Sequence, residues 1–329
     1  MPIYEGFIAA KIFNKEVLDG FFIKKSLNRK VPFHAEGHNN NNNRFDISEE
    51  AKHNISGNWE TVFSPNSEED KYVAKGVFKQ GDNKVTGTFR TTTGDYRYLE
   101  GIVDGDQLKL STFDGAHAFL FTATVTDSTM HGTFYSGNHW QESFTAKRNE
   151  TYELPDANAL TFLNDGYDKV SFSFPDIDGN MVSLDDERFK NKVVLIQIMG
   201  TWCPNCLDES KYYADFYKKN KNKDLEIIAL TFEYAKTETA AYKNIKRLTE
   251  TVGIEYPVLL AQYGSSSKRK AQEKLPMLNH VLSYPTTIFI GKNNVVRKIH
   301  TGFNGPATGD KYVEFKTEFE RFVDELLGE

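Results

Sequence analysis

Two cysteines separated by two residues constrain this chain more than any other feature of its sequence. Cys203 and Cys206 are the only cysteines among 329 residues, and they follow a short apolar run at 193–199 and precede a segment with helical periodicity. A helix starting here would direct backbone N–H groups and the positive end of its dipole at the first cysteine, which stabilises a thiolate. The spacing therefore predicts a dithiol that can close to a disulfide and reopen.

A zinc site or a purely structural disulfide fits the cysteine pair less well. A structural zinc site needs four ligands, and one Cys-x-x-Cys supplies two. The chain has no second cysteine pair, and no two histidines at x3–5 spacing follow the motif. A structural disulfide would close a very short loop and restrict the unfolded chain little. We therefore predict redox chemistry, with no metal and no cofactor.

Length and charge limit the remaining classes. A chain of 329 residues predicts two domains, and a net charge of −6 with a pI near 5.8 argues against nucleic acid as a partner. No apolar stretch is long enough for a transmembrane helix. The first residues do not have the pattern of a signal peptide. We expect either a cytoplasmic protein or an exported one whose signal has been removed.

The first half of the chain, 1–150, predicts a β-rich meander domain. Residues 57–148 alternate between apolar and polar positions in short runs, and residues 1–36 also have the pattern of strands. Tight-turn sequences separate the runs, at 81–83, 104–106 and 114–115. This pattern favours an antiparallel all-β domain, either a sandwich or an open barrel. The asparagine run at 39–43 predicts a solvated loop.

The second half, 155–329, alternates between strand and helix patterns. The apolar runs 193–199 and 225–232 are typical of central strands buried on both faces. Residues 237–252 predict an amphipathic helix, 286–290 and 295–299 predict a hairpin, and aromatic residues at helical spacing predict a last helix from about Tyr312. This order indicates an α/β domain with a central sheet.

The second half resembles the TlpA/ResA-like thiol-disulfide oxidoreductases, which have a thioredoxin-like fold. The resemblance rests on residues 174–179, on Gly200–Cys206 with Glu209, and on Tyr284–Ile290, in matching order and separation. It implies a protein-disulfide reductase with protein thiol or disulfide substrates and an upstream thiol donor. It also implies the periplasm or cell envelope, while a cytoplasmic location stays open. The β-rich half resembles additional N-terminal domains of some members, and its role is unknown.

Within this resemblance, Cys203 is expected to be the nucleophile, since it lies nearer the helix start, and Cys206 the resolving thiol. Glu209 is expected to exchange a proton with Cys206, although a first-turn glutamate favoured by the helix dipole is the alternative. Pro285 is expected to be a cis-proline that faces the dithiol. Residues expected to contact the substrate are Trp202, Pro204 and Tyr284.

Gln197 departs from thioredoxin itself, which has a buried aspartate at the corresponding strand position. This departure favours Glu209 as the acid–base group. Two other function classes remain as alternatives. A peroxiredoxin-like peroxidase needs Thr-x-x-Cys, but Gly200 stands three residues before Cys203. A binding protein with a redox-sensing dithiol fits the β-rich half better than the second half.

Overall fold

The structure, a computed structural model, describes residues 3–25, 28–37 and 44–329. The chain divides into two compact units. The first comprises Met1–Thr91 and Asp95–Leu154, and the second comprises Thr92–Gly94 and Pro155–Glu329. The predicted loop at 39–43 lies outside the described residues.

The main sheet of the first unit is antiparallel and closes on itself. Its strands are β4 (Gly57–Phe63), β5 (Tyr72–Gly81), β6 (Lys84–Thr91), β7 (Gly94–Asp95), β8 (Leu99–Asp104), β9 (Gln107–Phe113), β10 (Ala118–Val125), β11 (Thr129–Ser136) and β12 (Trp140–Arg148). Their order is β5-β4-β12-β11-β10-β9-β8-β6-β7, and pairing of β5 with β6 closes a ring of eight strands. The prediction of an antiparallel all-β domain is confirmed, and closure leaves no open edge among these eight strands.

Aromatic side chains fill the interior of the closed sheet. Phe63, Phe89, Phe121 and Phe144 are fully buried, and their rings pack edge-to-face or tilted at centroid distances of 5.0–6.3 Å. Each of these phenylalanines points inward because side chains alternate between the two faces of a strand. The first unit therefore has its own hydrophobic core.

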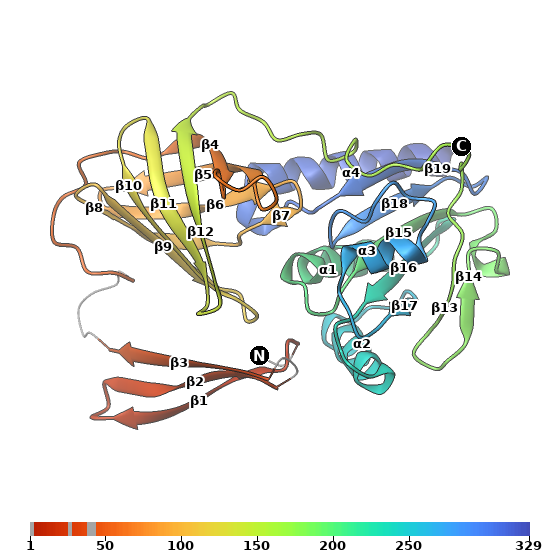
Figure 1. The fold of residues 1–329 in the computed structure, drawn as a ribbon. Helices are drawn as coiled ribbons and strands as arrows, with labels where there is room; N and C mark the ends of the chain where they lie inside the picture. The colour runs from red at the N-terminus through yellow and green to blue at the C-terminus, as the bar shows by residue number, and fades with distance from the viewer. Residues whose placement is uncertain (1–2, 26–27, 38–43) are drawn as a thin grey trace. The chain divides into compact units, whose positions relative to one another are not determined.

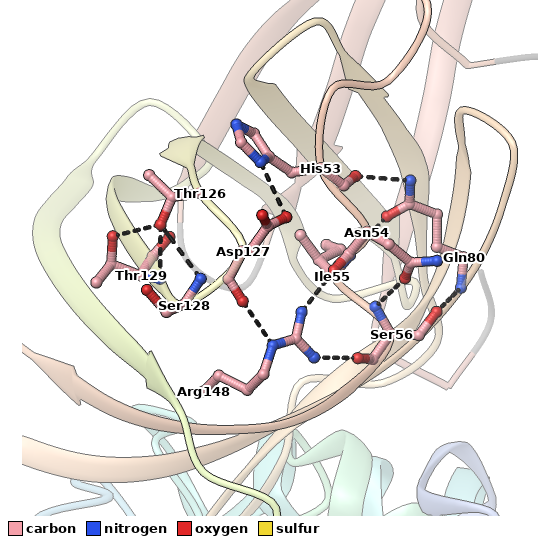
Figure 2. A network of polar contacts seen from close by, with 10 residues as sticks. All are labelled: His53, Asn54, Ile55, Ser56, Gln80, Thr126, Asp127, Ser128, Thr129 and Arg148. Atoms are coloured by element: carbon pink, nitrogen blue, oxygen red, sulfur yellow. Dashed lines mark hydrogen bonds and ion pairs between the residues drawn. The ribbon is translucent and has the colours of Figure 1, made fainter.

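A polar network closes one end of this sheet (Figure 2). Arg148, at the end of β12, donates hydrogen bonds to the carbonyl oxygens of Asn54, Ser56 and Asp127. The Gln80 side chain accepts from the N–H of Ile55 at 2.8 Å. These bonds hold the segment before β4 across the sheet end, where fully buried Ile55 covers the core.

A separate antiparallel sheet precedes this segment. It consists of β1 (Gly6–Phe13), β2 (Val17–Lys24) and β3 (Arg29–Glu36), in sequence order. The strands expected within residues 1–36 are thus present.

The second unit contains a five-stranded mixed sheet (Figure 1). Its strands are β15 (Val193–Met199), β16 (Leu225–Phe232), β17 (Val258–Gln262), β18 (Thr286–Ile290) and β19 (Val296–Thr301), in the order β17-β16-β15-β18-β19. β15 and β16 pair in parallel, as do β16 and β17, whereas β18 is antiparallel to β15 and β19. β15 is central and fully buried, as its apolar run predicts.

Helices cover this sheet. They are α1 (Pro204–Lys219), α2 (Glu238–Val252), α3 (Lys268–Lys274) and α4 (Asp310–Gly328). Phe319 of α4 packs against Tyr213 of α1 and Phe289 of β18, so α1 and α4 share one face of the sheet. The thioredoxin-like α/β class is confirmed for this unit. None of the helices in the described part of the chain is long and apolar enough to span a membrane.

Candidate active site

The two cysteines lie where the central strand β15 passes into α1. Cys203 is the N-cap of α1, and Pro204 occupies the first helical turn, where a missing N–H costs no hydrogen bond. Cys203 and Cys206 form a disulfide with Cα atoms 5.2 Å apart. The N–H of Cys206 donates to the Cys203 sulfur at 3.2 Å. The same N–H would stabilise a thiolate on Cys203 after reduction.

The two sulfur-bearing residues differ in exposure. Cys203 keeps 6% of its surface exposed, whereas Cys206 is completely buried. A substrate disulfide approaching from solvent therefore meets Cys203 first. Cys203 is also the cysteine nearer the N-terminus of α1, so exposure and helix position both favour Cys203 as the residue that meets the substrate.

The Tyr284–Pro285 peptide bond precedes β18 and is cis, as the resemblance implies. The carbonyl oxygen of Tyr284 lies 3.4 Å from the Cys203 sulfur, so this bend is adjacent to the dithiol. The rings of Tyr284 and Trp202 meet edge-to-face at 5.6 Å. Segments about 80 residues apart in sequence thus converge on Cys203.

Trp202 has a defined position in the turn before α1. Its indole Nε1–H donates to the carbonyl oxygen of Phe232 at 2.9 Å. The ring folds back over Gly200, where a Cβ atom would lie 2.4 Å from Nε1. Glycine at this position therefore permits the indole orientation. Trp202 is half-buried, while Pro204 and Tyr284 are buried, with contact to a substrate remaining a prediction for all three.

Glu209 lies on α1, about one helical turn beyond Cys206, and is completely buried. Gln197 Nε2–H donates to its Oε2 at 2.8 Å, and the hydroxyls of Tyr213 and Thr287 donate to its Oε1 at 3.2 and 3.1 Å. Burial raises the pKa of the Glu209 carboxyl from its ordinary 4.5 to about 7, although these three hydrogen bonds oppose the rise. The carboxyl can therefore accept or release a proton near neutral pH.

Sequence reasoning did not identify the residues that hold Glu209. Tyr213 is four residues beyond Glu209 on α1, so helical spacing alone would have indicated that they meet. Thr287 belongs to β18 and reaches Glu209 only through the pairing of β18 with β15, where it lies opposite Gln197. Residues 3–25, 28–37 and 44–329 contain no cluster of histidine, cysteine or acidic residues arranged to hold a metal ion.

Comparison with known proteins places this site within a family. Residues 156–313 match the Redoxin family. The thioredoxin-like protein YneN of Bacillus subtilis is 26% identical over 140 residues, covering 43% of this chain and 73% of YneN. The thiol-disulfide oxidoreductase ResA of Bacillus thuringiensis is 28% identical over 150 residues, covering 46% of this chain and 75% of ResA.

A solved structure is also similar. It is a thiol:disulfide interchange protein of the thioredoxin family from Chlorobium tepidum, with 21% identity and a TM-score of 0.36, covering 50% of this chain and 99% of its own. The family match, the ResA similarity and the dithiol geometry all fall in the second unit. That unit matches the Redoxin family over residues 156–313 and is similar to the ResA thiol-disulfide oxidoreductases, and an additional all-β unit precedes it in the sequence.

Proposed function

We propose that this chain reduces disulfides of protein substrates, with Cys203 as the attacking sulfur. The observation that carries the proposal is the placement of Cys203 at the start of α1, where the N–H of Cys206 donates to its sulfur. A helix N-terminus and a nearby N–H both favour the thiolate, which is the reactive form. Cys203 is slightly exposed, whereas Cys206 is completely buried, so Cys206 serves as the resolving thiol within the protein.

The reaction proceeds by two exchanges. The Cys203 thiolate attacks one sulfur of the substrate disulfide, and the other substrate sulfur leaves as a thiolate. Cys206 then attacks the Cys203 sulfur of the mixed disulfide and releases the second substrate thiolate. The substrate gains two electrons, and the enzyme is left with the Cys203–Cys206 disulfide seen in the structure.

Glu209 supports the second exchange, because Cys206 must lose its proton before it attacks. The buried Glu209 carboxylate takes that proton and later returns it when the dithiol is regenerated. A pKa of about 7 suits both directions, since neither the acid nor the carboxylate is strongly preferred at neutral pH. The residues that contact Glu209 fix its orientation in the protein interior.

The cycle needs an upstream thiol donor that reduces the Cys203–Cys206 disulfide. We assign the protein to the periplasm or cell envelope, by its similarity to ResA. The all-β unit has its own core and no cysteine, and we assign it to the selection of the protein partner.

Turnover of insulin disulfides by the full chain tests this proposal. Cys203→Ser should abolish reduction, whereas Cys206→Ser should form a mixed disulfide with the substrate and stall. Because the chain has no other cysteine, the double variant Cys203→Ser/Cys206→Ser is a thiol-free control. Full activity in Cys203→Ser would contradict the proposal. Peroxide consumption faster than insulin reduction would favour a peroxidase instead.

A further inference from the structure

A second buried carboxylate, Glu233, lies next to the turn that carries the dithiol. Glu233 directly follows β16, is completely buried, and has no role in the exchange described above. Its Oε1 accepts the N–H of Thr201 at 2.8 Å, and its Oε2 accepts the Thr201 hydroxyl at 2.7 Å. Both oxygens are thus directed at the residue two positions before Cys203.

The backbone around Glu233 is equally fixed. Its N–H donates to the carbonyl oxygen of Gln262 in β17 at 2.8 Å, and its carbonyl accepts from Ser265 at 3.1 Å. The preceding residue, Phe232, accepts the indole N–H of Trp202. The end of β16 therefore contacts two consecutive residues of the turn, Thr201 and Trp202.

Glu233 also connects this turn to α2. The Asn244 side chain hydrogen-bonds to the Glu233 carboxylate, and Arg247 donates to Asn244 Oδ1 at 2.5 Å. Burial raises the pKa of Glu233, while the hydrogen bonds from Thr201 and Asn244 and the charge of Arg247 oppose the rise. Burying a carboxylate costs free energy unless its oxygens accept hydrogen bonds. Here both oxygens of Glu233 accept hydrogen bonds from Thr201 in the turn.

We propose that Glu233 is a positioning residue for the dithiol: through its two hydrogen bonds to Thr201, it fixes the turn that places Cys203 at the N-terminus of α1. The inference rests on the proposed function, because it assigns Cys203 as the attacking sulfur. Within the turn, the N–H of Cys203 donates to the carbonyl oxygen of Gly200 at 3.1 Å. Thr201 lies between these two residues, so its position determines where the backbone of Cys203 lies. Displacing Thr201 moves Cys203 away from the helix N–H groups and lowers its thiolate fraction.

Two substitutions separate positioning from a direct effect of charge. Glu233→Gln removes the charge but keeps an oxygen for the Thr201 N–H, and its amide can donate to the Thr201 hydroxyl oxygen. Glu233→Ala removes both contacts. A direct effect of negative charge would disfavour the thiolate, so both substitutions would then lower the thiol pKa of Cys203. Positioning predicts that Glu233→Ala raises that pKa and that Glu233→Gln does not.

The test measures the rate of Cys203 alkylation by iodoacetamide in the reduced full-length protein as a function of pH. We expect Glu233→Ala to raise the midpoint by about one pH unit and to slow alkylation at pH 7 by up to about tenfold, in proportion to the thiolate fraction. Glu233→Gln should stay within about threefold of the parent rate at pH 7, because the contacts remain. The equilibrium constant with glutathione should shift in Glu233→Ala only.

Glu226→Ala is the matched control. Glu226 lies near the other end of β16 and accepts hydrogen bonds from Arg188, Lys192 and Tyr217, so its loss weakens the same strand without touching the turn. It should lower thermal stability and leave the alkylation profile unchanged. Equal shifts in Glu226→Ala and Glu233→Ala would overturn the proposal, as would lowered midpoints in both Glu233 variants.

Thr201→Val gives a second route if Glu233→Ala does not fold. It removes only the hydroxyl contact, so the midpoint should rise by a smaller amount, and an unchanged midpoint would refute the positioning role. The alkylation readout needs no protein substrate. If the parent protein reduced no disulfide, the proposed function would fail, while the alkylation profiles would still report on Glu233.

Discussion

Replacing Glu209 with glutamine should change how the stability of the second unit depends on pH. Glu209 has an ordinary pKa of 4.5 when unfolded and a pKa of about 7 in the folded protein, mainly because of burial. The folded state thus binds this proton more tightly than the unfolded state does. The stabilisation is complete below pH 4.5 and is lost as the pH rises to about 7.

The structure sets the size of this effect. A shift of 7 − 4.5 pKa units at 1.36 kcal/mol per unit gives a loss of roughly 3 kcal/mol, most of it between pH 5 and pH 8. Because Glu209→Gln cannot ionise, the difference in unfolding free energy, parent minus variant, should fall by about this amount over that range. The oxidised protein is used, so that the cysteines do not titrate.

The assay is urea unfolding followed by Trp202 fluorescence, after Trp59→Phe and Trp140→Phe leave Trp202 as the only tryptophan. Carboxyl carbon NMR on Glu209 gives the midpoint independently and should place it near 7. Glu238→Gln, on the exposed surface of α2, is the matched control, and its difference in unfolding free energy from the parent should not vary over this pH range. A parent-minus-variant difference that stays flat or rises with pH would refute the account of Glu209.

Three further predictions concern packing and domain structure. Gly200→Ala should displace the Trp202 indole, because the new Cβ would lie 2.4 Å from Nε1. The fluorescence emission of Trp202 should then shift, and insulin reduction should slow. An unchanged emission spectrum would contradict this prediction. Phe121→Ala should destabilise the first unit by about 3–5 kcal/mol, because the missing ring leaves a cavity in the core. At temperatures below the melting transition of the first unit, the second unit should still reduce insulin. A fragment that begins at Pro155 should fold and reduce insulin but lose partner selectivity; an insoluble fragment rescued by residues 1–150 would show that the two halves share one core.

The sequence predicted the elements with a strong periodicity. The runs at 193–199, 225–232 and 286–290 coincide with β15, β16 and β18 because continuous apolar stretches this short are typical of buried strands. The helix predicted over 237–252 begins one residue later, since Thr237 is its N-cap and accepts from the N–H of Ala240. Local patterns of this kind need no knowledge of distant contacts.

The elements that sequence analysis missed lack such a pattern. α3 (Lys268–Lys274) is seven residues long and mostly charged, with Ala271 as its buried residue, so it gives almost no periodic signal. β14 (Met181–Ser183) is three residues long and pairs only with β13 (Ser173–Pro175). Closure of the eight-stranded sheet depends on pairing between β5 and β6 in addition to β6 and β8, and alternation within single strands does not specify it.

The residues of the site also fall into those that the local sequence indicated and those that it did not. Cys203 and Cys206 were identified as candidates by their spacing, and Glu209, three residues beyond Cys206, by the family resemblance. Thr287 and Glu233 reach the site from other strands, through sheet pairing that the sequence does not reveal. An acidic residue directly after the apolar run of β16 was the available signal for Glu233, since a charge next to a buried strand needs a partner.

The order in which the two cysteines react tests the central claim most directly. The reduced protein is treated at pH 7 with less than one equivalent of iodoacetamide, and the labelled peptides are mapped by mass spectrometry. Because Cys203 is at the helix N-terminus and Cys206 is buried, nearly all of the label should be on Cys203. Label that appears first on Cys206 would contradict the assignment of Cys203 as the attacking sulfur.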